Sequence, residues 1–392
     1  MIRNATVVNG TGAAPAPATT VVVDHGRIAW IGPDESAPSF GEHPVVEAAG
    51  ASLLPGLINA HVHLANDGAA DFAGQITADS ATTAAVRALA NAQASLDYGI
   101  TTVRDCGAAN GTAIDVATAI ADGLAEGPRV VAAGRVLTMT GGHSHYMGVE
   151  VDGTDQARRA VRREVSLGAD FIKVIATGGV LTPGRHPAQI ALHEDELSWI
   201  VREAHAAGRR VAAHAIGREG IANALAAGVD SLEHGFHLDE ELMEIANEQG
   251  TFLVPTLVAL EGILDPDGTP PDRVVEKALE QRDRARGMFR SAVAAGIRVA
   301  LGTDAGTPHN PHTMVAREMR GMAALGLPHL AVVRAATLAA AQNLDLHNEI
   351  GSIEAGKIAD LVLFPGRVSE DFSGLDTPLL VARNGRILRQ GL

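Results

Sequence analysis

Hydrophobic positions in the middle of the chain form short apolar runs that alternate with longer, alanine-rich amphipathic stretches. Continuous apolar runs of about four to eight residues are typical of strands buried on both faces of a parallel sheet. Alternation of such strands with helices predicts βα units, and eight of them close naturally into a (β/α)8 TIM barrel. The expected strands cover residues 57–64, 100–105, 129–137, 171–176, 211–214, 230–234, 252–255 and 299–304, and helices are expected at 79–97, 155–167, 193–207, 217–226 and 272–295.

Both ends of the chain show a different pattern, in which short alternating runs are separated by Gly, Pro and Asp. Thr20–Val23 and Asp360–Phe364 are examples, and Asn384-Gly385 is a typical hairpin turn. This pattern is typical of a small antiparallel sheet. We therefore expect a β-sandwich-like domain built from residues 1–55 and 355–392, with the barrel at 56–354.

Composition narrows the classes of function. The 392 residues are 46% hydrophobic, carry a net charge of −15 and contain no block of basic residues, which argues against nucleic acid and anionic membranes as partners. The single cysteine, Cys106, excludes an internal disulfide and fits a reducing cytoplasm. No signal peptide or transmembrane run is expected. We expect a cytoplasmic protein acting on a small molecule, and a homo-oligomer is left open.

Histidine and acidic residues stand at the ends of several predicted strands. In a barrel, the carboxyl ends of the strands carry the active site. His61 and His63 alternate along one strand, so their side chains point the same way and suit one face of a metal ion. The other candidates at strand ends are His214, His234, Asp304 and Lys173.

Lys173 is one of only three lysines and lies in the apolar run 171–176. A buried ammonium is costly unless it is neutralised, paired or chemically altered. A neutral amine can react with carbon dioxide and become a carbamate, an anionic ligand able to bridge two divalent ions. The alternative is a Schiff-base nucleophile, which would leave the histidines and Asp304 without a task.

Six segments of the sequence resemble the amidohydrolase superfamily, closest to its imidazolonepropionase-like and prolidase-like branch with a binuclear metal centre. A seventh segment, Gly356-Lys-Ile-Ala-Asp-Leu-Val362, is similar to the family's return to the small β domain. The six are Leu54-Pro-Gly-Leu-Ile-Asn-Ala-His-Val-His-Leu64, Gly99-Ile-Thr-Thr-Val-Arg-Asp105, Gly168-Ala-Asp-Phe-Ile-Lys-Val174, Ala212-Ala-His-Ala215, Ser231-Leu-Glu-His-Gly235 and Gly302-Thr-Asp-Ala-Gly306.

The resemblance implies a ligand set and a reaction. His61, His63 and Asp304 would hold the more buried ion, His214 and His234 the other, and carbamylated Lys173 would bridge them. Zinc is expected, with manganese or cobalt as alternatives. A hydroxide between the ions would attack an amide of a dipeptide, an N-acyl amino acid or a small cyclic amide, and Asp304 would transfer the proton.

Residues in the loops are candidates for binding substrate. The loop at 140–148 resembles a family element in which His143 would contact the substrate carbonyl or carboxylate, with Tyr146 behind it. Ile216 stands where prolidase-like members tend to carry a tyrosine, so Arg185 or Arg218 is considered for a carboxylate instead. The segment 260–273 is expected to be a loop that could act as a lid.

Three other functions compete with this interpretation. A mononuclear aminohydrolase or deaminase usually lacks the bridging lysine, which Lys173 supplies here. A phosphotriesterase or lactonase would share the ligand set, but the β segment before His61 favours the amidohydrolase branch. A non-catalytic homologue would be expected to lack ligands, and none of the expected ligands is missing from the sequence.

Overall fold

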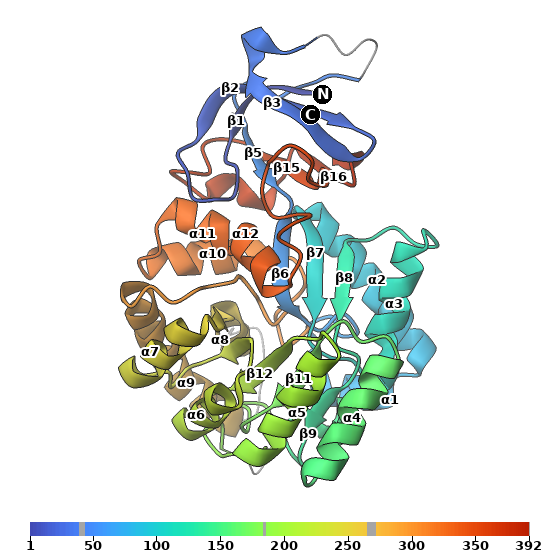
Figure 1. The fold of residues 1–392 in the computed structure, drawn as a ribbon, viewed down its shortest axis with the longest axis vertical. Coiled ribbons are helices and arrows are strands. Elements are labelled where there is room, and N and C mark those ends of the chain that lie inside the picture. Colours follow the sequence, from blue (N-terminus) through green and yellow to red (C-terminus); the bar gives the residue numbers. More distant parts are fainter. Residues whose placement is uncertain (39–43, 183–185, 265–271, 392) are drawn as a thin grey trace.

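The middle of the chain forms parallel strands, and the candidate site residues lie on these strands or next to them. The computed structural model describes residues 1–38, 44–182, 186–264 and 272–391, and in these ranges the central strands form a three-stranded and a six-stranded sheet (Figure 1). Their orders are β6-β7-β8 and β10-β9-β11-β12-β13-β14. The strands are β6 (Leu57–Val62), β7 (Ile100–Asp105), β8 (Arg129–Ala132), β9 (Val136–Thr138), β10 (Gly148–Glu150), β11 (Ile172–Ile175), β12 (Val211–Ala215), β13 (Ser231–His234) and β14 (Phe252–Val254).

The single strand expected at 129–137 is wrong, because the chain bends in its middle. β8 and β9 are separated by a turn at Gly134, whose φ of 74° is left-handed and therefore interrupts an extended strand. β8 pairs with β7, whereas β9 pairs with β11. The described strands therefore form two separate sheets instead of one closed barrel.

The eighth expected strand, 299–304, is also wrong as a strand, since it forms only isolated bridges. The segment lies between the first and last central strands: Ala300 donates to the carbonyl of Leu253 at 3.0 Å and Ala60 donates to that of Leu301 at 2.8 Å. Asp304 has a left-handed φ of 58°, which ends regular pairing at this point.

Helices flank the central strands, and the five helices expected from the sequence are confirmed to within two residues. Polar side chains begin several of them; Ser80 accepts from the N–H of Thr83 at the start of α2, and Asp239 accepts from Leu242 at the start of α7. No helix in the described ranges is long and apolar enough to cross a membrane. The helices are α1 (Phe72–Ala78), α2 (Ala81–Asp97), α3 (Thr112–Ala121), α4 (Thr154–Ser166), α5 (Glu194–Ala206), α6 (Arg218–Ala227), α7 (Glu240–Gln249), α8 (Leu257–Ile263), α9 (Asp272–Ala294), α10 (Val315–Ala324), α11 (His329–Ala335) and α12 (Leu338–Asn343).

Strands from both ends of the chain lie in one eight-stranded sheet at one end of the molecule (Figure 1). The sheet is mixed, since β1 pairs in parallel with β4 and β5, so the expectation of a purely antiparallel sheet is wrong. Asn384 and Gly385 both have positive φ, 51° and 76°, as a two-residue hairpin turn requires. The domain boundaries stay a prediction. The strands are β1 (Ile2–Val7), β2 (Ala16–Asp24), β3 (Arg27–Pro33), β4 (Val46–Glu47), β5 (Ser52–Pro55), β15 (Leu361–Phe364), β16 (Leu380–Arg383) and β17 (Arg386–Gln390).

Candidate metal centre

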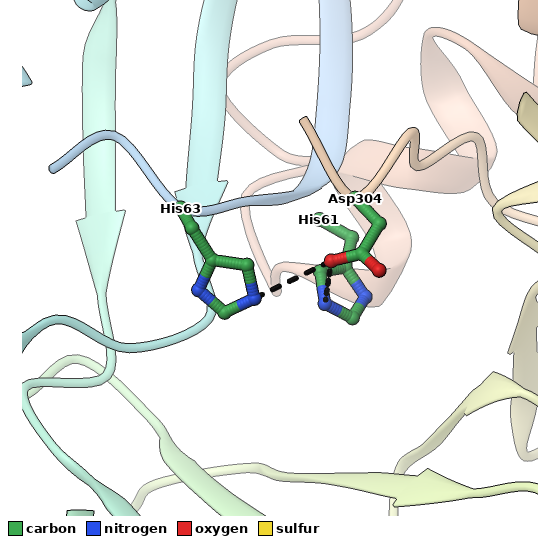
Figure 2. A group of neighbouring side chains, drawn as sticks. All are labelled: His61, His63 and Asp304. Atoms are coloured by element: carbon green, nitrogen blue, oxygen red, sulfur yellow. Dashed lines mark ion pairs between the residues drawn. The ribbon is translucent and has the colours of Figure 1, made fainter. Parts of the chain in front are cut away.

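The end of β6 and the segment after residue 299 bring two histidines and one carboxylate together (Figure 2). Oδ1 of Asp304 lies 3.3 Å from Nε2 of His61 and 3.3 Å from Nε2 of His63. Both histidines are buried, with 1% and 6% of their surface exposed. Three ligand atoms of these types within 4.8 Å of one another can hold one divalent ion.

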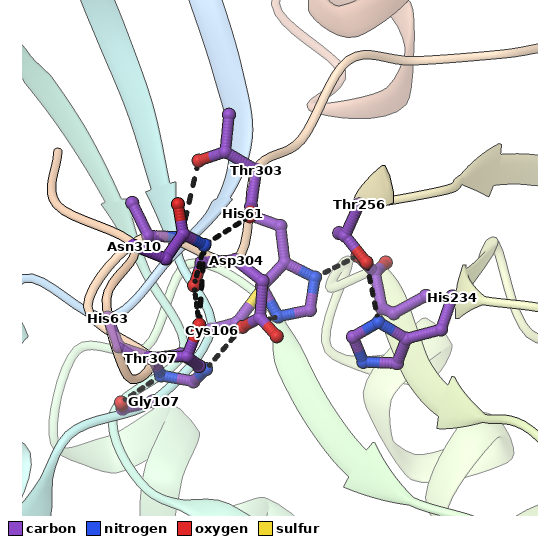
Figure 3. A network of polar contacts seen from close by, with 12 residues as sticks. His61, His63, Cys106, Gly107, His234, Thr256, Thr303, Asp304, Thr307 and Asn310 are labelled. Atoms are coloured by element: carbon purple, nitrogen blue, oxygen red, sulfur yellow. Dashed lines mark hydrogen bonds and ion pairs between the residues drawn. The ribbon is translucent and has the colours of Figure 1, made fainter. Parts of the chain in front are cut away.

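Asp304 is held in its left-handed conformation by the loop that follows it. Its N–H donates to the carbonyl of His61 at 2.8 Å. Its own carbonyl accepts from the side-chain amide of Asn310 at 2.9 Å and from the hydroxyl of Thr307 at 2.7 Å, a network drawn in Figure 3. These bonds fix the carboxylate toward His61 and His63 and compensate for the strain of a positive φ.

Backbone carbonyls fix the tautomers of two histidines. Nδ1 of His63 donates to the carbonyl of Gly107 at 2.9 Å (Figure 3), and Nε2 of His214 donates to that of Gly178 at 2.9 Å. A carbonyl can only accept, so the proton must lie on these nitrogens. Nε2 of His63 and Nδ1 of His214 are therefore the nitrogens left with a lone pair for a metal ion.

Side chains orient the other two histidines. Nδ1 of His61 donates to the carboxylate of Glu233 at 2.7 Å, which leaves its Nε2 with a lone pair. Nδ1 of His234 shares a 2.7 Å hydrogen bond with the hydroxyl of Thr256 (Figure 3). In each of the four histidines one ring nitrogen is thus hydrogen-bonded to a group outside the predicted ligand set, and the other ring nitrogens of His61 and His63 lie 3.3 Å from Asp304 within that set.

Glu233 belongs to a buried ion pair that the sequence interpretation missed. Its carboxylate accepts from Arg104 at 2.6 Å and from the hydroxyl of Ser231 at 2.6 Å, in addition to His61. Arg104 also donates to the carbonyl of Ala60 at 2.7 Å. The sequence did contain a sign of this ion pair, since Arg104 and Glu233 are charged residues within the apolar strands β7 and β13. Charged residues are rarely buried in such strands unless they are paired.

Lys173 lies on β11 with only 2% of its surface exposed. Its Nζ lies 3.4 Å from Nε2 of His61, and in the described parts of the chain it forms no ion pair with a carboxylate. β11 pairs in register with β12, where Ile175 stands opposite His214. A buried amine without an anionic partner is thus placed beside the histidines.

The second pair of histidines adjoins the first. The rings of His214 and His234 lie 4.6 Å apart, and those of His61 and His234 lie 5.2 Å apart. Burial lowers the pKa of His61, His214 and His234 well below the usual range, and neighbouring cationic groups lower it further. Burial opposes protonation of His63 too, but the Asp304 carboxylate, which accepts a hydrogen bond from its ring, outweighs burial and raises the pKa of His63. All six predicted metal ligands line one cavity of about 660 Å³, counting the part open to solvent.

The candidate substrate residues have different positions. His143 lines the cavity; its Nδ1 lies 2.5 Å from the hydroxyl of Thr182, and burial lowers its pKa to about 3. Tyr146 does not line the cavity and packs on Phe72, with ring centres 6.2 Å apart. Arg218 also lies outside it, in ion pairs with Asp239 and Glu241. Arg185 lies outside the described residues.

The segment 260–273 is not simply a loop. Residues 260–263 belong to α8, residues 272–273 begin α9, and 265–271 lie outside the described residues. Leu260 and Ile263 line the cavity. The prediction of a lid stays untested.

Gly179 has a role that the sequence did not reveal. A Cβ atom at this position would lie 2.4–2.6 Å from the imidazole ring of His143, so only glycine leaves room for the ring. Neither Gly178 nor Gly179 has a left-handed φ, which argues against a turn as the reason for the pair.

Cys106 lines the floor of the cavity and lies close to His61 and Glu233. Burial raises the pKa of its thiol to about 12, so it remains protonated and unreactive. Since Nδ1 of His61 already donates to Glu233, this group does not form a second metal site.

Comparisons with known proteins match most of the chain to one family and to several relatives. The Amidohydrolase family profile matches residues 52–388. Ochratoxinase of Aspergillus niger is 30% identical over 361 residues, covering 84% of this chain and 73% of that protein. Imidazolonepropionase of Acidiphilium cryptum is 29% identical over 374 residues, covering 86% and 85%. A solved Xaa-Pro dipeptidase with methionine bound in its active site has a TM-score of 0.92 and 31% identity over 100% of this chain and 99% of that chain.

Proposed function

Because this chain belongs to the amidohydrolase family, with an amide-hydrolysing relative and a dipeptidase among its neighbours, we propose that it is a metal-dependent hydrolase of amide bonds. The substrate class is a dipeptide, an N-acyl amino acid or a small cyclic amide. The observation that carries the proposal is the set of six side chains on one cavity, in which each histidine has one ring nitrogen hydrogen-bonded to a group outside the set. We further propose that the two central sheets and the segment 298–305 together correspond to a TIM barrel.

The donor set fits divalent cations. Four buried imidazoles, the Asp304 carboxylate and the Lys173 side chain line one cavity, and nitrogen and oxygen donors of these types are the ligands that divalent cations take. His61, His63 and Asp304 would hold one ion, and His214 and His234 the other. Zinc suits these ligands, and manganese or cobalt would also suit them.

We propose that Lys173, as a carbamate, would help to hold both ions. The neutral amine attacks carbon dioxide, a carbon–nitrogen bond forms, and one proton is released to solvent or a neighbouring base. The product is an anion with two oxygen donors, which turns an unpaired buried amine into a charge-compensated ligand.

Divalent ions in this site would polarise the substrate carbonyl and lower the pKa of water. The protein's own residues handle protons and orientation. Asp304 lies beside both His61 and His63 and accepts the proton released during attack, then returns it to the leaving amine. His143 stays neutral because of its low pKa; its Nδ1 is hydrogen-bonded to the hydroxyl of Thr182, and its other ring nitrogen would donate to the substrate carbonyl.

A cytoplasmic location and a homo-oligomeric state stay predictions from the sequence. The function itself is tested by removing metal with a chelator, restoring zinc, manganese or cobalt, and assaying a panel of amides. Hydrolysis should depend on the added metal and should fall by a factor of about 100 or more in Asp304→Asn. Full activity in the chelated protein or in Asp304→Asn would overturn the proposal.

A further inference from the structure

The cavity above the metal ligands has a wall of apolar side chains. Its members come from different elements and define the apolar wall: Phe72 of α1, Leu181 after β11, Ile216 after β12, Phe236 after β13, and Leu260 and Ile263 of α8. All but Leu181 are buried, with 2–6% of their surface exposed. A substrate that reaches the metal ligands must therefore displace water from this wall.

The apolar wall adjoins the metal ligands directly. The ring of Phe72 lies 6.1 Å from that of His63, and the ring of Phe236 lies 5.6 Å from that of His234. The two aromatic rings thus adjoin two different histidines of the ligand set. A group attached to the scissile amide contacts the wall as soon as the carbonyl reaches the ligands.

α8 is held rigidly against the cavity. Both oxygens of the buried Glu318 carboxylate accept backbone N–H groups at the start of the helix, from Leu257 at 2.9 Å and from Val258 at 2.8 Å. A Cβ at Gly262 would lie 3.0 Å from backbone carbonyl oxygens of residues 308 and 309, so the helix packs closely on that loop. The wall is therefore preformed, which favours binding of a complementary group.

The formally charged side chains that line the cavity belong to the predicted ligand set, among the residues that the structure describes. Among the lining residues that the structure describes, only Lys173 and Asp304 are formally charged, histidines aside, and both belong to the ligand set. Arg218 is turned away into ion pairs with surface carboxylates. An ammonium or carboxylate placed against the apolar wall would lose its hydration without gaining a partner there.

We infer that the substrate is an amide whose group seated against the apolar wall is uncharged, an aryl or branched alkyl group, and that Leu260 sets this preference. The inference rests on the proposed amide hydrolysis and narrows its substrate class. It disfavours zwitterionic dipeptides, whose two charged ends flank the amide closely.

Three compounds of nearly equal shape test the inference with the metal-loaded full chain. They are L-phenylalanyl-L-leucine, N-(3-phenylpropanoyl)-L-leucine, which lacks the ammonium, and N-(3-methylbutyl)-3-phenylpropanamide, which lacks both charges. We expect kcat/KM for the neutral amide to exceed that for the dipeptide by about tenfold or more. A dipeptide hydrolysed as well as the neutral amide overturns the inference but leaves amide hydrolysis established.

Matched variants of α8 test whether Leu260 sets the preference for an uncharged substrate group. Leu260→Ala should lower kcat/KM for the neutral amide by about tenfold and change that for the dipeptide little. Leu257→Ala is the control, because Leu257 is buried on the same helix but does not line the cavity. Ile263→Val, a milder change, serves if Leu260→Ala does not fold. Equal losses for both substrates in Leu260→Ala would overturn the role of Leu260.

Calorimetric binding separates this inference from the proposed function. If none of the three compounds is hydrolysed, the proposed function fails for this class. Tighter binding of the neutral amide than of the dipeptide would then still support an apolar wall that selects uncharged groups. Equal or weaker binding of the neutral amide would overturn the inference.

Discussion

Replacing Glu233 by glutamine should disturb metal binding through His61. The carboxylate accepts three hydrogen bonds, two of them on the oxygen that faces Arg104 and Ser231 and one on the oxygen that faces His61. The amide oxygen of glutamine will face the guanidinium, so its NH₂ must face His61. That NH₂ can only donate, which forces the proton of His61 onto Nε2, the nitrogen needed by the metal.

The expected magnitudes follow from burial. Glu233 is fully buried and its Arg104 partner is 3% exposed, so the variant leaves an uncompensated cation, a loss of about 3–5 kcal/mol in the free energy of unfolding. Loss of the bond that orients a metal-binding histidine typically lowers metal affinity by about 10- to 100-fold. Denaturant unfolding of the metal-free protein and competition with a chelator measure the two effects separately.

Glu164→Gln is the matched control for Glu233→Gln. Glu164 is also fully buried and paired with an arginine, Arg135, but it lies on the outer helix α4 away from the cavity. We expect it to lose stability without losing metal affinity. If Glu233→Gln bound metal as tightly as Glu164→Gln, the assignment of Glu233 as the residue that orients His61 would be refuted.

Three other predictions concern residues around the site. Gly179→Ala should displace the ring of His143 and lower kcat by about 10-fold or more, with unchanged metal content by elemental analysis. Thr256→Val should weaken binding of the ion proposed at His214 and His234 about tenfold, through the lost bond to His234, in a metal titration. Burial raises the pKa of Glu318 from 4.5 to about 8, so the folded state binds its proton more tightly than the unfolded chain; stability is full below pH 4.5 and is lost as pH rises toward 8. Glu318→Gln should therefore show a flatter dependence of unfolding free energy on pH over this window, and an unchanged slope would contradict the assignment.

The pattern of hydrophobic residues was sufficient for most central elements because each apolar run is buried as a unit. It failed at 129–137, where Gly134 adopts a left-handed φ, and at 299–304, where Asp304 does. An apolar run shows that a segment is buried, but it does not show where the backbone bends within it. At 299–304 the departure from a regular strand is at Asp304, a residue of the candidate site, where local strain is common.

The four candidate histidines were predictable because they lie at or next to the carboxyl ends of β6, β12 and β13, and all of them line one cavity. The residues that orient them were not predictable in the same way. Glu233 acts through a contact from β13 to β6 in the other central sheet, Thr256 acts from the start of α8, and Gly179 acts by leaving space for a ring from another loop. Arg218 is on the expected helix start but pairs with Asp239 and Glu241, which sequence spacing does not reveal.

Metal stoichiometry in the presence of bicarbonate tests the central claim most directly. The chelated protein is titrated with zinc, with and without bicarbonate, beside Lys173→Ala and the control Lys357→Ala, whose lysine lies in the C-terminal segment with Glu354 as partner. We predict about two ions per chain with bicarbonate for the wild type and for Lys357→Ala, and fewer for Lys173→Ala. A single ion in the wild type, or two ions in Lys173→Ala, would contradict a binuclear centre bridged by Lys173.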